Sequence, residues 1–250
     1  FSLVHDDIMD AAPLRRGHST VHTKWNLNTG ILSGDTMLIL AYQYFEQYEP
    51  NIFQELAKIF SKTAIEVCEG QQYDVDFEQQ AQVSTDQYLK MIAYKTAVLV
   101  GAALQMGAII AQTSEENKQK IYDFGLALGI AYQLQDDYLD TFGDASFGKK
   151  IGGDILQNKK TLLYLKALEK GTPEQKQELL TLYSTEPKSE EEKITRVTEF
   201  FIAAESHTFL RAQVEAYTLK AFAILDTLDI PEEKKNILKE FGSSLMNRTI

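Results

Sequence analysis

One acidic pattern occurs twice in the sequence, as Asp-Asp-Ile-Met-Asp at residues 6–10 and as Asp-Asp-Tyr-Leu-Asp at residues 136–140. On a helix, the first and last carboxylates of Asp-Asp-x-x-Asp lie one turn apart on the same face. Like charges at that spacing repel, so we expect a bound cation to relieve them. Mg2+ takes one or two carboxylates and fills its other positions with water and phosphate oxygens. The repeated pattern therefore predicts magnesium sites that serve a phosphorylated substrate.

Basic and amide side chains accompany both acidic patterns. Arg15 and Arg16 follow the first one. They are either exposed ion-pair partners of the aspartates or diphosphate ligands, which guanidinium groups bind in a bidentate way. Lys95 and Thr96 lie inside an apolar stretch, where the lysine either extends to solvent or meets the same substrate. Gln133 falls three, four and seven residues before the second set of aspartates, on the same helix face.

A glycine-rich segment, residues 143–158, follows the second acidic pattern and mixes its glycines with lysines and aspartates. We expect a functional loop here, because it connects two well-formed helices and its basic side chains can close over phosphates. Lys149, Asp154 and Lys159 are the candidates, although each taken singly is better explained as solvated surface. The combination of all these elements, rather than any one of them, indicates diphosphate chemistry.

The composition excludes several classes of protein. The 250 residues are 44% hydrophobic and 24% charged, with a formal net charge of -11 and one cysteine. The negative charge argues against nucleic acid and anionic membrane surfaces as partners. A single cysteine, Cys68, excludes an intramolecular disulfide and a cysteine-rich zinc site, and we expect a cytoplasmic protein. The longest apolar run, residues 97–111, is shorter than the roughly 20 residues of a membrane span, so we expect a core helix and no span.

Apolar residues recur at helical spacing along most of the chain, which predicts an all-α fold with a single domain over residues 1–250. Ser84 is an N-cap candidate, and Thr113 with Glu116 reads as a capping box. Gly34 and Gly70 fall inside helices, where we expect them to allow close helix–helix approach. The expected helices cover residues 1–10, 28–48, 51–80, 85–112, 113–142, 159–170, 173–183, 190–205, 208–228 and 231–247.

At this point the chain resembles the trans-isoprenyl diphosphate synthases, also called the polyprenyl synthetase family. The resemblance covers about two-thirds of the chain and rests on segments that occur in the family's order, namely residues 3–10, 14–17, 32–35, 69–71, 95–96, 133–140, 148–149 and 158–159. It implies the all-α isoprenoid synthase fold, a homodimer, and two acidic patterns that face each other across a central cavity and hold three Mg2+ ions. The implied reaction condenses isopentenyl diphosphate with an allylic diphosphate.

The resemblance also assigns roles to residues. Direct metal ligands would be Asp6, Asp10 and Asp136, with Asp7, Asp137 and Asp140 in support. The allylic diphosphate would be held by Arg15, Lys95, Lys149 and Lys159, and the isopentenyl diphosphate by Arg16. Thr96 and Gln133 would present oxygen lone pairs to an allylic carbocation formed when the diphosphate departs.

Product length is expected to depend on the residues just before the first acidic pattern. Phe1 stands five residues before Asp6, about 7.5 Å along a helix axis at 1.5 Å per residue. In the family, a bulky residue at this position forms a floor that stops the growing chain, and Ser2 beside it is small. This resembles the geranylgeranyl type more than the farnesyl type, and both products remain possible.

Two other functions are compatible with parts of the sequence. A class I terpene cyclase shares the fold and the first acidic pattern, but such cyclases usually carry an Asn/Asp-x-x-Ser/Thr-x-x-x-Glu set at the second site. A non-catalytic subunit of a heteromeric synthase typically loses aspartates that are complete here. The family's Gly-Lys and Arg cluster upstream of the first pattern has no counterpart in this chain, so we expect a longer native protein with further N-terminal helices.

Overall fold

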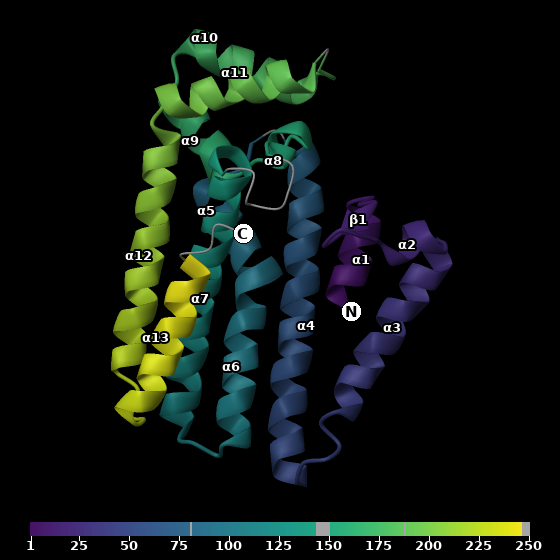
Figure 1. Cartoon of the computed structure of the whole chain (residues 1–250), viewed down its shortest axis with the longest axis vertical. Helices are drawn as coiled ribbons and strands as arrows, with labels where there is room; N and C mark the ends of the chain where they lie inside the picture. Colours follow the sequence, from purple (N-terminus) through teal and green to yellow (C-terminus); the bar gives the residue numbers. More distant parts are fainter. Residues whose placement is uncertain (81, 144–150, 188, 247–250) are drawn as a thin grey trace. The chain divides into compact units, whose positions relative to one another are not determined.

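A computed structural model of the chain describes residues 1–80, 82–143, 151–187 and 189–246. These residues are mostly helical (Figure 1), which confirms the expected all-α fold class. The chain divides into two compact units, Phe1–Val67 and Cys68–Ile250, and the single domain expected from the sequence stays a prediction.

The first unit carries the first acidic pattern. Its elements are α1 (Ser2–Met9), a hairpin of β1 (Leu14–Arg15) and β2 (His18–Ser19), α2 (Val21–Lys24), α3 (Leu27–Gln43) and the first part of α4 (Pro50–Gln79). Helix α1 packs against α3 at Gly34, where an added Cβ would lie 2.2 Å from His5 Nε2. The expected close approach at this glycine is therefore confirmed. The hairpin was not predicted, because two-residue strands leave no period-two pattern in the sequence.

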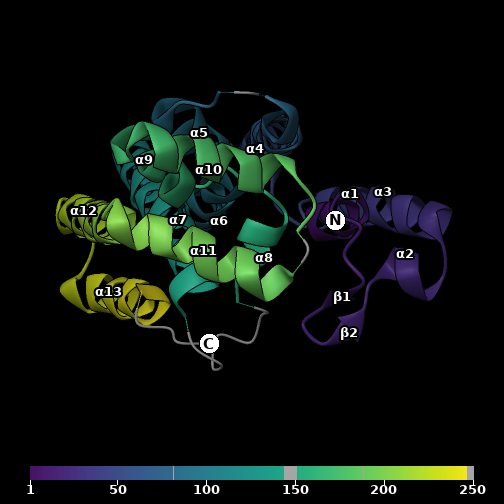
Figure 2. The same cartoon turned by 90° about the horizontal axis from the view of Figure 1, so that it is seen from above.

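The second unit is built around α7, with α6 on one side of it and α12 along another (Figure 1). Figure 2 shows α10 and α11 lying across one end of these helices. The elements of this unit after α4 are α5 (Thr85–Ile92), η1 (Ala93–Ala97), α6 (Val98–Ile110), α7 (Glu115–Phe142), α8 (Gly153–Leu156), α9 (Leu162–Lys170), α10 (Pro173–Ser184), α11 (Glu190–Ala203), α12 (Ser206–Asp226) and α13 (Glu232–Met246).

The expected continuous helix over residues 85–112 is wrong in one respect, since a single π-helical turn, η1, interrupts it. Small residues hold this region against α7. A Cβ at Gly129 would lie 2.6 Å from the Cα of Ala97, and one at Gly125 would lie 2.8 Å from the Cα of Gly101. The backbones of α7 and of the η1–α6 segment therefore meet directly, with no side chain between them.

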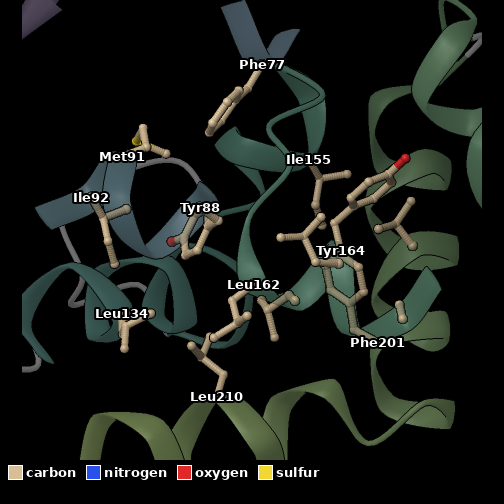
Figure 3. Packing of buried hydrophobic residues seen from close by; sticks show 14 of the residues in the cluster. Phe77, Tyr88, Met91, Ile92, Leu134, Ile155, Leu162, Tyr164, Phe201 and Leu210 are labelled. Carbon is tan, nitrogen blue, oxygen red and sulfur yellow. The ribbon is translucent and has the colours of Figure 1, made fainter. Parts of the chain in front are cut away.

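A buried hydrophobic cluster joins α5, α7, α8, α9, α11 and α12 (Figure 3). Leu134 of α7 and Leu210 of α12 are fully buried in it, as are Tyr164 of α9 and Phe201 of α11. Burying a Leu or Phe side chain contributes about 1.5–3 kcal/mol, so this cluster holds the second acidic pattern in a rigid frame.

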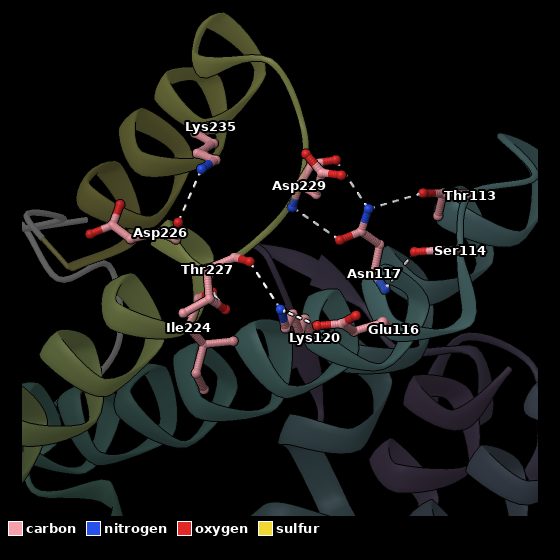
Figure 4. Close-up of polar contacts among 10 residues, drawn as sticks. All are labelled: Thr113, Ser114, Glu116, Asn117, Lys120, Ile224, Asp226, Thr227, Asp229 and Lys235. Atoms are coloured by element: carbon pink, nitrogen blue, oxygen red, sulfur yellow. Dashed lines mark hydrogen bonds and ion pairs between the residues drawn. The ribbon is translucent and has the colours of Figure 1, made fainter.

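The N-terminal cap of α5 agrees with the sequence-based prediction, whereas that of α7 differs from it. Ser84 caps α5 in a capping box with Gln87, as expected for the serine. The predicted box at the start of α7 is wrong, because Ser114 is the N-cap and accepts from Asn117 N at 3.2 Å. The buried Asn117 side chain also exchanges two hydrogen bonds with the backbone of Asp229, which ties α7 to the α12–α13 connection (Figure 4).

The apolar segment Thr85–Ile110 qualifies, by length and composition alone, as a candidate membrane span. Core helices of soluble proteins also meet that criterion. Of its most apolar 18-residue window, 33% is buried in the structure. Val98 and Ala102 are buried, whereas Leu99 and Ile110 are exposed. The expected core helix is thus buried along one face only.

Candidate functional site

The first acidic pattern lies at the C-terminal end of α1. The Asp10 amide donates to the Asp6 carbonyl at 2.9 Å, so these two residues are separated by one helical turn, as the spacing predicted. Asp7 is buried, with 5% of its surface exposed. Asp6 and Asp10 are half-buried. The two outer carboxylates therefore share a face and are more accessible than the middle one.

The hairpin after α1 separates the two arginines. Arg15 donates from Nε to Asp7 Oδ1 at 2.7 Å and from Nη2 to Asp6 Oδ2 at 3.0 Å. Arg16 and Gly17 form the hairpin tip, with φ of 52° and 76°, and Arg16 is exposed there. Two left-handed residues in a two-residue loop match the twist of a tight hairpin. Arg15 thus orients the aspartates, while Arg16 extends from the tip.

Phe1 belongs to a cluster of aromatic rings within the first unit. Its ring meets Phe60 of α4 edge-on at a centroid distance of 6.1 Å. Phe60 in turn contacts Tyr42 of α3 at 4.8 Å and Phe45 at 5.4 Å. Ser2, the first residue of α1, is half-buried beside it. Sequence analysis found Phe1 but not the other three rings of the cluster, which lie about 40 to 60 residues away along the chain.

A chain of hydrogen bonds runs through the second acidic pattern. Thr96 Oγ1 donates to Gln133 Oε1 at 3.1 Å, and Gln133 Nε2 donates to Asp137 Oδ1 at 3.0 Å. The other oxygen of Asp137 accepts from the Tyr88 hydroxyl. Three residues predicted from sequence are thus connected, and Tyr88 is the member that sequence analysis missed.

Burial gives this chain an unusual electrostatic setting. Asp137 is 4% exposed and Tyr88 is 2% exposed. Burial raises the pKa of Asp137, as does the negative charge of Asp154, while the hydrogen bonds from Tyr88 and Gln133 oppose that rise. Burial and the neighbouring Asp137 carboxylate raise the pKa of Tyr88 well above its usual value. The tyrosine therefore keeps its proton and remains a donor to Asp137.

The other two aspartates of the pattern differ in exposure. Asp136 is half-buried, whereas Asp140 is 8% exposed. Asp140 Oδ2 accepts from the amide of Asp154 at 3.0 Å, and its carbonyl accepts from the amide of Gly152 at 2.6 Å. A Cβ at Gly153 would come within 3.1 Å of Asp140 Oδ1. Asp140 therefore anchors residues 152–154, which belong to the glycine-rich segment.

Lys95 does not extend to solvent. Its Nζ donates to Asp74 Oδ2 of α4 at 2.6 Å, and its side chain is 24% exposed. The lysine belongs to the π turn η1, and π turns inside helices are frequent at functional sites. Gly70 makes room for this turn, since a Cβ there would lie 2.2 Å from the Lys95 backbone nitrogen. The close approach expected at Gly70 is therefore confirmed.

The remaining predicted residues lie after the second pattern. Lys149 falls in residues 144–150, outside the described residues, so the role expected for it stays a prediction. Lys159 is half-buried just after α8, and its amide donates to the Asp154 carbonyl at 2.9 Å. Gln71 of α4 has a buried Nε2 without a hydrogen-bond partner among the described residues.

The donor set fits magnesium. Both patterns supply hard carboxylate oxygens, with the outer aspartates Asp6, Asp10 and Asp136 more accessible than Asp7 or Asp137. Within the described ranges, no three acidic, histidine or cysteine side chains already converge on one point. Mg2+ needs only one or two carboxylates and completes its octahedron with water and phosphate oxygens. The arrangement therefore suits a metal that arrives with a diphosphate.

Comparison with known proteins gives an independent view of the chain. A sequence model of the family described as polyprenyl synthetase matches residues 1–200. The geranylgeranyl pyrophosphate synthase of Geoglobus acetivorans is 34% identical over 251 residues, covering 99% of this chain and 76% of that protein. The geranylfarnesyl diphosphate synthase of Natronomonas pharaonis is 35% identical over 257 residues, covering 100% of this chain and 72% of that protein.

The fold gives the same result. A crystal structure of a geranylgeranyl pyrophosphate synthase matches with a TM-score of 0.94 and 50% sequence identity, covering 99% of this chain and 77% of that one. This chain spans about three quarters of the length of all three relatives.

Proposed function

This chain belongs to the polyprenyl synthetase family, and from that premise we propose that it condenses isopentenyl diphosphate with an allylic diphosphate. It is a trans-prenyltransferase that makes short-chain isoprenyl diphosphates. The observation that carries the site assignment is the hydrogen-bonded set Thr96–Gln133–Asp137, which joins Thr96 of η1 to Gln133 and Asp137 of α7, the helix of the second acidic pattern. A scaffold that used its aspartates only for solubility would have no reason to bury Asp137 and connect it to the other two side chains.

Magnesium is the cofactor of this family, and we propose three ions in this chain. Asp6, Asp10 and Asp136 would bind them, with Asp7, Asp137 and Asp140 holding these ligands in place. When bound, the metal withdraws charge from the diphosphate so that it can leave. The protein side chains then have separate tasks, which follow from their contacts.

Lysine and arginine side chains hold the diphosphates in this proposal. Lys95, Lys159 and Lys149 would bind the allylic diphosphate together with Arg15, and Arg16 at the hairpin tip would bind isopentenyl diphosphate. Support comes from Asp74, whose carboxylate lies 2.6 Å from Lys95 Nζ and orients the lysine side chain within the π turn. Charge-assisted contacts of this kind are roughly twice as strong as neutral hydrogen bonds.

The hydrogen-bond chain orients the groups that face the carbocation. Asp137 accepts from the Gln133 amide, which fixes the Gln133 oxygen toward Thr96. The Thr96 hydroxyl donates its proton in a hydrogen bond to that oxygen, so the lone pairs of Thr96 Oγ1 remain available to stabilise a positive carbon. The double bond of isopentenyl diphosphate attacks the cation, and the proton that is lost passes to the departed diphosphate. No side-chain nucleophile is needed in this sequence of steps.

The experiment that tests this function is an incubation with Mg2+, labelled isopentenyl diphosphate and each allylic primer in turn. We expect label in products that are longer than the primer by five-carbon units. Cyclic hydrocarbon without use of isopentenyl diphosphate would identify a terpene cyclase instead, and absence of turnover by the purified chain would fit a non-catalytic subunit.

We propose that the product is geranylgeranyl diphosphate and that Phe1 limits its length. The Phe1 ring is held edge-on against Phe60, so it is a rigid obstacle rather than a mobile one. Phe1→Ala is expected to shift the products to at least one further five-carbon unit, measured by chromatography of the dephosphorylated products. Leu3→Ala, two residues along the same helix and 47% exposed, is the control and should leave the length unchanged. The same product distribution in Phe1→Ala and wild type would remove Phe1 from this role.

We also propose a cytoplasmic homodimer. Helix α3 supports this, because several of its apolar side chains are exposed in the described structure, among them Leu32 at 64% and Ile39 at 60%. Apolar patches of this kind on a helix mark interaction surfaces. The mass of the purified protein by light scattering after gel filtration tests the proposal.

A further inference from the structure

A buried lysine on α11 is not used by the mechanism above. Lys193 is 2% exposed, and its Nζ donates to Asn158 Oδ1 at 2.5 Å. Among the described residues, it also lies near the ring of Tyr183, whose centroid is 5.5 Å from Nζ. Both partners are neutral. Burying an ammonium group is costly unless it is paired and hydrogen-bonded, so the hydrogen bond to Asn158 is the contact that helps to offset this cost.

Asn158 controls the direction of the chain just before Lys159. It has a left-handed backbone, with φ of 57°, and ends the short turn of α8. Asparagine tolerates this conformation better than most residues, but at a cost that other contacts must offset. The Asn158 amide donates to Ile155 O at 3.2 Å, and the Lys159 amide donates to Asp154 O. The hydrogen bond from Lys193 then fixes the side chain of Asn158 as well.

The segment is held at its other points as well. On the far side of Lys159, Lys160 Nζ donates to three carbonyls at the C-terminal end of α4, those of Phe77 at 2.5 Å, Glu78 at 3.2 Å and Gln80 at 2.6 Å. Carbonyls at a helix end have no partner within the helix, and a lysine satisfies them well. Towards the N-terminus, Asp140 binds the amides of Gly152 and Asp154.

Helix α11 also presses on this segment through packing. Gly152 has a φ of 79°, and a Cβ there would lie 2.7 Å from Cγ1 of Ile194, the residue after Lys193. Residues 152–160 are therefore fixed from α7, α4 and α11, so that the backbone of Lys159 has little freedom. A lysine that binds a diphosphate gains from such fixation, because less conformational entropy is lost on binding.

We propose that Lys193 is a positioning residue for Lys159, acting through the side chain of Asn158. The inference rests on the proposed function, which gives Lys159 its diphosphate. It predicts that Lys193 and Asn158, which do not touch the reacting atoms, affect the affinity for the diphosphate. Their effect should exist only while Lys159 is present.

A double-mutant cycle tests this proposal. Lys193→Met keeps the apolar stem, and Asn158→Gly keeps the left-handed backbone while removing the acceptor. We expect each to raise KM for the allylic diphosphate about 10-fold, with kcat changed less than about 3-fold. In a Lys159→Met background, neither should raise KM more than about 2-fold, because residues that act through one another are not additive. Lys170→Met, an exposed lysine on α9, is the control for loss of one positive charge and should leave KM unchanged.

The cycle separates positioning from stability. If Lys193→Met and Asn158→Gly raise KM by the same factor with and without Lys159, or lower only the melting temperature, the proposal is overturned. Asn158→Gly keeps the test available if Lys193→Met fails to fold. The same cycle is measured by calorimetry with inorganic pyrophosphate and Mg2+, which needs no turnover, so absence of prenyl transfer would count against the proposed function and leave this inference testable.

Discussion

Replacing Asp136 by alanine, or separately Asp6 by alanine, is expected to lower kcat about 1000-fold, the scale seen when one preorganised electrostatic group is removed from a transition state. Both carboxylates lie on accessible faces of their helices, and neither is part of a hydrophobic core. The ion pair of Asp6 with Arg15 is partly exposed, with side chains 20% and 35% accessible, so its loss costs little stability. Steady-state kinetics with labelled isopentenyl diphosphate measures the effect, and circular dichroism should show unchanged helical content.

The matched control for this pair is Asp123→Ala. Asp123 lies on α7 like Asp136, and it accepts only a local hydrogen bond from Gln119 in the described contacts. We expect near wild-type kcat in this variant. A rate within a few-fold of wild type for Asp136→Ala or Asp6→Ala would break the assignment of that acidic pattern to the metal.

Gly70→Ala is expected to abolish most activity, although Gly70 has no side chain that could meet the substrate, because it displaces Lys95. Its Cβ would lie 2.2 Å from the Lys95 nitrogen and 2.7 Å from both Lys95 Cα and Tyr94 C, all backbone atoms that cannot rotate away. Helix α4 must then separate from the π turn, which breaks the Lys95–Asp74 contact. We expect kcat/KM to fall on the order of 100-fold and stability to fall by about 1–3 kcal/mol. Kinetics and urea unfolding measure the two effects.

Gly107→Ala supplies the control for a helical glycine. Gly107 lies within α6, and a Cβ there would meet nothing within 4 Å. Alanine is a better helix former than glycine by about 1 kcal/mol, so this variant should be slightly more stable and equally active. If Gly70→Ala behaved like Gly107→Ala, the π turn would not depend on close contact with α4.

Local patterns in the sequence predicted what depends on local structure. The spacing of Asp6 and Asp10 placed them one turn apart, and their helix ends where expected. Gly34 and Gly70 were expected at close contacts, because a glycine inside a helix is costly unless something needs the space. The box at Thr113 was wrong for a local reason too, since Ser114, one residue later, competes for the same cap.

Contacts between residues that are far apart in the chain could not be predicted from the sequence. The Tyr88 hydroxyl meets Asp137 across 49 residues, and no spacing rule connects a tyrosine on one helix to an aspartate on another. The π turn at Lys95 has no composition of its own, because it depends on Gly70 and Gly129 from two other helices. Lys193 resembled an ordinary charged residue on an amphipathic helix, and only its burial against Asn158 distinguishes it.

The central claim is that both acidic patterns hold magnesium for a departing diphosphate. Calorimetric titration with a non-hydrolysable allylic thiolodiphosphate, with and without Mg2+, tests it most directly. The account predicts tight binding that requires Mg2+ and is lost in both Asp6→Ala and Asp136→Ala. Equal affinity without the metal, or in either variant, would contradict it.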